Sequence, residues 1–173
     1  MKRLIFTLLY NNGHFMLSRN FRLQKIGDLN WLLENYNLHE VSRGLDELMI
    51  LDISKNKKNI EKFSFFVNEI SKKCFVPVTV GGGINNISIA DNYMKNGADK
   101  LLVNTILSSD QNFVRELISI YGKQCIVAGI DFLEDNKDLV STNNFKVFSN
   151  NGTKEITKDI YEWNKKIIDL NVG

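Results

Sequence analysis

The sequence has few cysteines and no surplus of charge of one sign. Its two cysteines, Cys74 and Cys125, lie far apart inside apolar runs, so we expect buried, reduced thiols rather than a disulfide or a metal site. The 22 basic and 20 acidic residues are intermixed and give a formal net charge of +2. Because counterion release requires a basic stripe, this distribution argues against a nucleic-acid partner.

Long apolar runs are also missing near the start of the chain. A short, mostly apolar stretch after Arg3 is broken by Asn11, Asn12 and Gly13, so it is too short to span a membrane and lacks a signal-type cleavage region. We therefore expect a cytoplasmic protein without a membrane partner. The 173 residues, 43% of them hydrophobic, are enough for one sizeable core, so a single domain over residues 1–173 is expected.

Short apolar runs alternate with helical patterns along most of the chain. Nearly continuous apolar runs are typical of strands buried on both faces of a parallel sheet. The predicted strands are 4–10, 48–53, 77–80, 100–104 and 125–131, and the predicted helices are 60–70, 87–94, 113–121 and 160–168. Residues 138–142 and 145–149 interrupt this alternation and predict a small hairpin.

An alternating βα chain closes either as a doubly wound sheet or as a (β/α)8 barrel. A dinucleotide-binding sheet needs spaced glycines after its first strand, whereas here Gly81, Gly82 and Gly83 are consecutive and follow the third strand. In a barrel, the carboxyl ends of the strands face one mouth. Asp52, the glycines, Asn104 with Thr105, and Asp131 all stand at such ends, which favours the barrel.

Three consecutive glycines destabilise a helix or strand, which indicates a local requirement for backbone without side chains. One explanation is a tight strand-to-helix turn. The other is an oxyanion site, because backbone N–H groups without Cβ atoms can approach a phosphate closely.

Five stretches follow one another along the chain: KRLI, DELMILDIS, PVTVGGGI, GADKLLVNT and QCIVAGID. In their order and spacing they resemble the cyclase subunit of imidazole glycerol phosphate synthase, a (β/α)8 TIM barrel that works with a glutaminase. The resemblance covers the entire chain, but such barrels run to roughly 250 residues. We therefore expect only the first five βα units, either as a fragment or as a product that completes its sheet by pairing with another chain.

The resemblance implies roles at the mouth. It assigns one substrate phosphate to Gly82, Gly83, Asn104 and Thr105, and it makes Asp131 one of two catalytic aspartates.

At the position of the other aspartate, however, this sequence has Leu9, which cannot transfer a proton. Leu17 likewise replaces a lysine that serves the second phosphate. Whether His14 or Tyr10 takes over the lost role stays open, and His39 is expected on a helix or loop surface.

At the opposite barrel end, the resemblance implies an ammonia gate formed by Arg3, Glu47 and Lys100. Such charges are tolerated at strand ends only when they pair with one another. An ordinary salt-bridge cluster is the alternative explanation. Asp99 matches the family's contact to the glutaminase.

A chain that has the gate residues but lacks one catalytic aspartate resembles the divergent copies of this cyclase found in surface-polysaccharide gene clusters. The favoured interpretation is an ammonia-delivering subunit for sugar amidination. Its partners would be a HisH-like glutaminase, a phosphorylated small-molecule or sugar substrate and a sugar amidotransferase, with no cofactor and no metal. The alternatives are a genuine synthase subunit of histidine biosynthesis and a non-catalytic scaffold.

Overall fold

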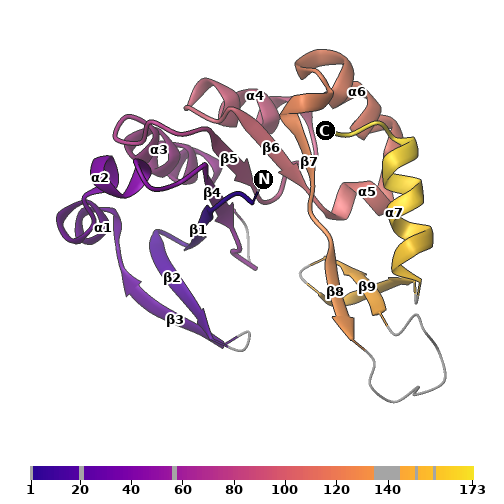
Figure 1. Ribbon diagram of the computed structural model, residues 1–173, viewed down its shortest axis with the longest axis horizontal. Coiled ribbons are helices and arrows are strands. Elements are labelled where there is room, and N and C mark those ends of the chain that lie inside the picture. Colours follow the sequence, from indigo (N-terminus) through magenta and orange to yellow (C-terminus); the bar gives the residue numbers. More distant parts are fainter. Residues whose placement is uncertain (1, 20–21, 56–57, 135–144, 151, 158) are drawn as a thin grey trace. The chain divides into compact units, whose positions relative to one another are not determined.

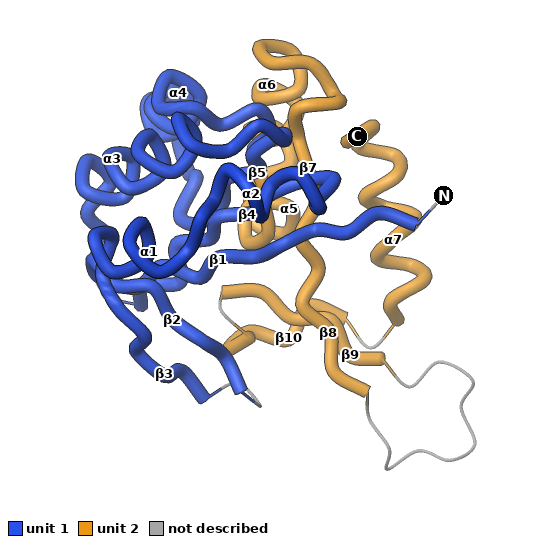
Figure 2. The backbone as a smooth tube through the Cα atoms, turned by 60° about the vertical axis from the view of Figure 1, so that its left-hand side comes forward, with its two compact units in different colours: residues 1–101 blue, residues 102–173 orange. Residues whose placement is uncertain are grey.

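The computed structural model describes residues 2–19, 22–55, 58–134, 145–150, 152–157 and 159–173. They form two compact units, residues 1–101 and 102–173, which have different colours in Figure 2. The elements of unit 1 are β1 (Ile5–Asn11), β2 (His14–Arg19), β3 (Arg22–Gly27), α1 (Leu29–Asn35), α2 (Leu38–Ser42), β4 (Glu47–Asp52), α3 (Ile60–Ser71), β5 (Val78–Gly81) and α4 (Ile87–Lys95). Strand β6 (Lys100–Val103) begins in unit 1 and ends in unit 2.

The sheet of unit 1 has the strand order β3-β2-β1-β4-β5. Strands β1, β4 and β5 are parallel, with Leu8 opposite Ile50 and Ile50 opposite Val80, whereas β2 and β3 are antiparallel additions at the edge. The parallel strands are the predicted apolar runs, and the predicted alternation with helices is confirmed here (Figure 1).

The helices of unit 1 pack on the sheet through aromatic side chains. The ring of Tyr10 on β1 lies 5.0 Å from the rings of both Phe63 and Phe66 on α3, and Phe63 lies 5.3 Å from Tyr93 on α4. The side chains of Leu8 and Ile50, which lie on the strands between them, are fully buried. Burying such side chains stabilises the fold by about 1.5–3 kcal/mol each, so this layer holds the strand ends in place.

Asparagine caps fix where these helices begin. The side chain of Asn59 accepts the Lys62 N–H at the start of α3, and Asn86 accepts the Ile89 N–H at the start of α4. Gly97, with φ of 102°, follows the end of α4, as the sequence predicts.

Unit 2 contains a three-stranded antiparallel sheet in the order β10-β9-β8. The Asp110 side chain accepts the Phe113 N–H, and Gly122, with φ of 86°, closes the same helix. The elements of unit 2 are α5 (Thr105–Ser109), α6 (Gln111–Tyr121), a 3-10 turn (Lys123–Cys125), β7 (Ile126–Ala128), β8 (Asp131–Glu134), β9 (Phe145–Ser149), β10 (Lys154–Thr157) and α7 (Ile160–Asp169).

Three expectations need correction. The predicted strand 125–131 is interrupted: β7 ends at Ala128, and Asp131 begins β8. Directly after β7, the Gly129 N–H still donates to the Val103 carbonyl oxygen at 2.7 Å.

The second correction concerns the predicted hairpin of 138–142 and 145–149. Strand β9 is instead the central strand of a sheet, paired with both β8 and β10. The predicted segment 138–142 lies outside the described residues. The third concerns Cys74 and Cys125, which are free thiols but only half-buried.

Candidate functional site

A charged network lies at the amino ends of the parallel strands in unit 1. Glu47, the first residue of β4, is 4% exposed, and its Oε2 lies 2.7 Å from Lys100 Nζ and 3.7 Å from Arg3 Nη1. The Thr79 hydroxyl donates to the other carboxylate oxygen of Glu47. The structure thus brings together the three residues predicted for the gate and adds Thr79, a buried polar residue that the sequence analysis missed.

The electrostatics of this network favour a charged Glu47. Burial alone would raise the pKa of Glu47, but hydrogen bonds from Lys100 and Thr79, together with the positive charges of Lys100 and Arg3, hold that pKa below its ordinary value. A buried carboxylate with two cationic partners ties the ends of neighbouring strands together.

Acid should therefore weaken the protein through Glu47. Because the folded-state pKa is lowered, the stabilisation is present above the ordinary pKa of the carboxyl group and is lost as pH falls through the lowered value. Glu47→Gln should flatten the fall in unfolding free energy below about pH 5, measured by denaturant titration of the full-length protein. Glu162→Gln, in the exposed pair with Lys166, is the control and should leave that slope unchanged. An equally steep slope in Glu47→Gln would contradict this assignment.

Asp99 lies beside the network and has an internal contact. Its Oδ2 accepts the Val78 N–H at 2.8 Å, and its own N–H donates to the Val78 carbonyl oxygen at 2.8 Å. Asp99 is nevertheless exposed, so a role in partner contact stays a prediction.

The glycine turn lies at the opposite, carboxyl end of β5. At Gly82, with φ of 117°, a Cβ would overlap the backbone oxygen of Asp52, and at Gly83, with φ of 78°, it would lie 2.5 Å from Lys58 Cδ. The Tyr93 hydroxyl donates to the Gly82 carbonyl oxygen at 2.9 Å. Close packing therefore requires glycine here, which gives the tight-turn explanation a physical basis and leaves the phosphate site a prediction.

Leu9, Leu17 and His14, which the resemblance links to the altered mouth, lie on β1 and β2. Leu9 is half-buried, with Met16 opposite on β2 and Leu51 opposite on β4, so its strand neighbours are apolar. Leu17 is 47% exposed. His14 begins β2, opposite Asn11.

Tyr10, the other residue considered for the lost role, is buried against α3. Its pKa is raised by burial and by the nearby charge of Asp52. A neutral phenol with a raised pKa is a poor proton donor near neutral pH.

The remaining predicted mouth residues lie in unit 2. The Asn104 amide donates to the Gly129 carbonyl oxygen at 3.1 Å, and Thr105 Oγ1 accepts the Asn150 N–H at 3.3 Å. Desolvation raises the pKa of Asp131, although its side chain is exposed, and a hydrogen bond with Asn104 opposes that rise. Asn104 and Asp131 are therefore neighbours. Convergence of this pair with Gly82 and Gly83 stays a prediction.

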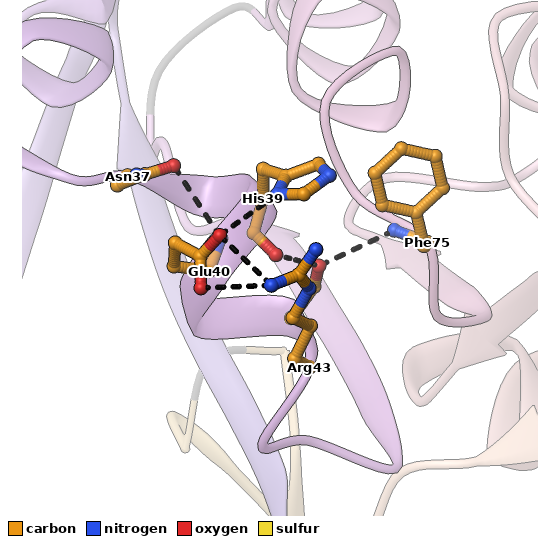
Figure 3. A network of polar contacts seen from close by, with 6 residues as sticks. Asn37, His39, Glu40, Arg43 and Phe75 are labelled. Atoms are coloured by element: carbon orange, nitrogen blue, oxygen red, sulfur yellow. Dashed lines mark hydrogen bonds and ion pairs between the residues drawn. The ribbon is translucent and has the colours of Figure 1, made fainter.

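A second polar network in unit 1 surrounds His39 (Figure 3). His39 Nδ1 lies 3.2 Å from Glu40, its ring meets Phe75 edge-on at 4.9 Å, and the Phe75 N–H donates to Ser42 Oγ at 3.5 Å. A pocket of about 380 Å³ adjoins His39 and Phe75. His39 lies on α2 with nearly half of its side chain exposed, as predicted, and no predicted site residue lines this pocket.

Two kinds of feature are missing from the described part of the chain. It contains no group of three or more histidine, cysteine, aspartate or glutamate side chains that could hold a metal ion. Within the same residues, no helix is long and apolar enough to cross a membrane.

Comparison with known proteins agrees with the βα architecture. Residues 25–173 match the family described as histidine biosynthesis protein. Over 93% of its length, the chain is 45% identical to a protein of Parasynechococcus marenigrum provisionally named imidazole glycerol phosphate synthase subunit hisF2, of which it covers 58%.

Two further relatives carry the name imidazole glycerol phosphate synthase subunit HisF. The chain is 34% identical to that of Nitrosopumilus maritimus and 31% identical to that of Bacillus cereus, over 99% of its length and 67% and 65% of theirs. The chain therefore belongs to the histidine biosynthesis protein family, as a HisF-type protein with an α/β fold. It spans 58 to 67% of the length of these three relatives.

Proposed function

We propose that this chain is the cyclase-type half of a cytoplasmic glutamine amidotransferase pair. It receives ammonia from a HisH-like glutaminase and delivers it for sugar amidination in surface-polysaccharide biosynthesis. Its other partners are a phosphorylated small-molecule or sugar substrate and a sugar amidotransferase. The observation that carries this proposal is an intact network at Glu47 in a chain that has Leu9 where the family has an aspartate.

The network supports the ammonia-receiving half of the proposal. Maintaining a 4%-exposed carboxylate between Lys100 and Arg3 costs desolvation free energy, and replacing such buried ion pairs by apolar residues is often neutral or stabilising. A role beyond stability accounts for the retention of charge at these strand ends. Exposed Asp99 and Phe75, the latter 72% exposed, flank β5 near its amino end and would contact the glutaminase.

Leu9 supports the altered chemistry. An apolar residue with Leu51 and Met16 opposite it has no group within its own side chain to give or take a proton. The exposed Leu17 has also replaced a phosphate-binding lysine, so both losses affect handling of the standard substrate.

The second candidate is a genuine synthase subunit of histidine biosynthesis, and the printed names of the relatives favour it. In that case another residue would replace the acid. A non-catalytic scaffold is the third candidate, although it would not require charge at Glu47.

Two assays separate these functions. The full-length gene is expected not to restore growth of a histidine auxotroph, whereas the full-length protein should activate its glutaminase. Restored growth would favour the synthase, and absence of both effects would favour the scaffold.

A further inference from the structure

Lys58 crosses the glycine turn that precedes α4. Its Cδ and Cε lie 2.5 and 3.0 Å from the point where a Cβ of Gly83 would be, so the lysine stem occupies the open side of that residue. Neither a phosphate role nor any other function has been assigned above to Lys58, which precedes the Asn59 cap of α3.

The ammonium group of Lys58 is held in place by Asp52 at the end of the neighbouring strand. Its Nζ donates to the Asp52 carbonyl oxygen at 2.6 Å and lies 3.3 Å from the Asp52 Oδ2 atom. The other carboxylate oxygen of Asp52 accepts the Ser54 N–H at 2.9 Å. An ammonium has three N–H donors, and within the described residues the hydrogen bond to the Asp52 carbonyl oxygen accounts for one of them.

Burial distinguishes the two partners. The side chain of Asp52 is 1% exposed, whereas that of Lys58 is 21% exposed, so the aspartate is enclosed and part of the lysine side chain reaches solvent. Asp52 therefore anchors the ammonium group, while the lysine stem lies beside Gly83.

We propose that Lys58 is the cationic arm of an anion site on the Gly82–Gly83 turn and binds a phosphate monoester dianion together with the turn's backbone N–H groups. This inference rests on the proposed function, in which the chain handles a phosphorylated substrate. Charge-assisted hydrogen bonds are about twice as strong as neutral ones, and lysine binds phosphate as a point charge. Because Asp52 already offsets the lysine charge, the expected contribution is about tenfold in affinity rather than a thousandfold.

The test is a titration of the isotope-labelled full-length protein with inorganic phosphate, followed through the backbone amide signals of Gly82 and Gly83. Phosphate should shift both signals in the unmodified protein. Lys58→Met keeps an unbranched stem over Gly83 but removes the charge, and it should weaken phosphate binding by about tenfold. Lys58→Arg should bind within about threefold of the unmodified protein.

Two further variants keep the result interpretable. Lys55→Ala, an exposed lysine of the same loop, should leave phosphate affinity unchanged. Lys58→Met combined with Asp52→Asn removes the unpaired buried carboxylate, so it should fold and still bind phosphate about tenfold more weakly.

Equal phosphate affinity in Lys58→Met and the unmodified protein would overturn the role of Lys58 while leaving the glycine site intact. Unshifted Gly82 and Gly83 signals in the unmodified protein would overturn the phosphate site itself. Neither result bears on glutaminase activation, which tests the proposed function separately.

Discussion

Replacing Leu9 by aspartate is expected to raise cyclase turnover of the full-length protein by at least about tenfold. A positioned acid or base typically contributes about 10²- to 10⁴-fold in rate, and tenfold corresponds to about 1.4 kcal/mol of transition-state stabilisation. The new carboxyl would have Leu51 and Met16 opposite it on the neighbouring strands, and apolar surroundings raise the pKa of a carboxyl group. A raised pKa favours the protonated form needed in a general acid.

Weak substrate binding would limit the gain in turnover from Leu9→Asp. Proton transfer accelerates only a substrate that is held in place, so Leu9→Asp should need Leu17→Lys as well if the second phosphate is unbound. Leu17 is 47% exposed, so a lysine there can remain hydrated. Steady-state assays with saturating ammonium would measure turnover without the glutaminase.

Leu9→Asn is the matched control, because asparagine has the shape of aspartate but cannot ionise. It should leave turnover at the level of the unmodified protein. Equal rescue by Leu9→Asn and Leu9→Asp would contradict a proton-transfer role, and no rescue by Leu9→Asp with Leu17→Lys would show that the mouth no longer suits the cyclase substrate.

Replacing Lys100 by alanine is expected to destabilise the full-length protein by about 3 kcal/mol. Removing one partner of a buried pair leaves an uncompensated charge, here the carboxylate of Glu47, with only Thr79 and the more distant Arg3 remaining. Denaturant unfolding measures this loss. Lys95→Ala, in the exposed pair with Asp91, is the control and should cost about 0.3–0.5 kcal/mol.

The same variant tests ammonia transfer. Lys100→Ala should separate glutamine hydrolysis from product formation, so that glutaminase turnover exceeds amination, whereas activity with added ammonium is retained. Arg3→Ala should have the same effect with a smaller loss of stability, because Arg3 is largely exposed. Tight coupling in both variants would return the network to an ordinary salt-bridge cluster.

The parallel strands were predictable because burial on both faces leaves a local signature. Strands β1, β4 and β5 are nearly continuous apolar runs, so the positions of their amino and carboxyl ends can be predicted from the bounds of these runs. Strands β2 and β3 were missed because polar residues interrupt the apolar pattern in 14–27. Most residues of β3 are also exposed, so burial leaves no signal there.

Tertiary contacts explain the other differences. Gly82 and Gly83 need bare backbone because Asp52 and Lys58, some 25 to 30 residues earlier in the chain, pack against them, and no local pattern predicts that contact. Thr79 was also missed, because its role depends on the hydrogen bond that its hydroxyl donates to Glu47 on the neighbouring strand. The charges at Arg3, Glu47 and Lys100 were found because the resemblance supplied their joint role.

The most direct test is the turnover of the unmodified full-length protein, assayed with its glutaminase and the cyclase substrate. The predicted result is activated glutamine hydrolysis together with cyclase turnover about 10²- to 10⁴-fold below that of a cyclase with both aspartates. Turnover at ordinary cyclase rates with Leu9 in place would contradict this account and assign the chain to histidine synthesis.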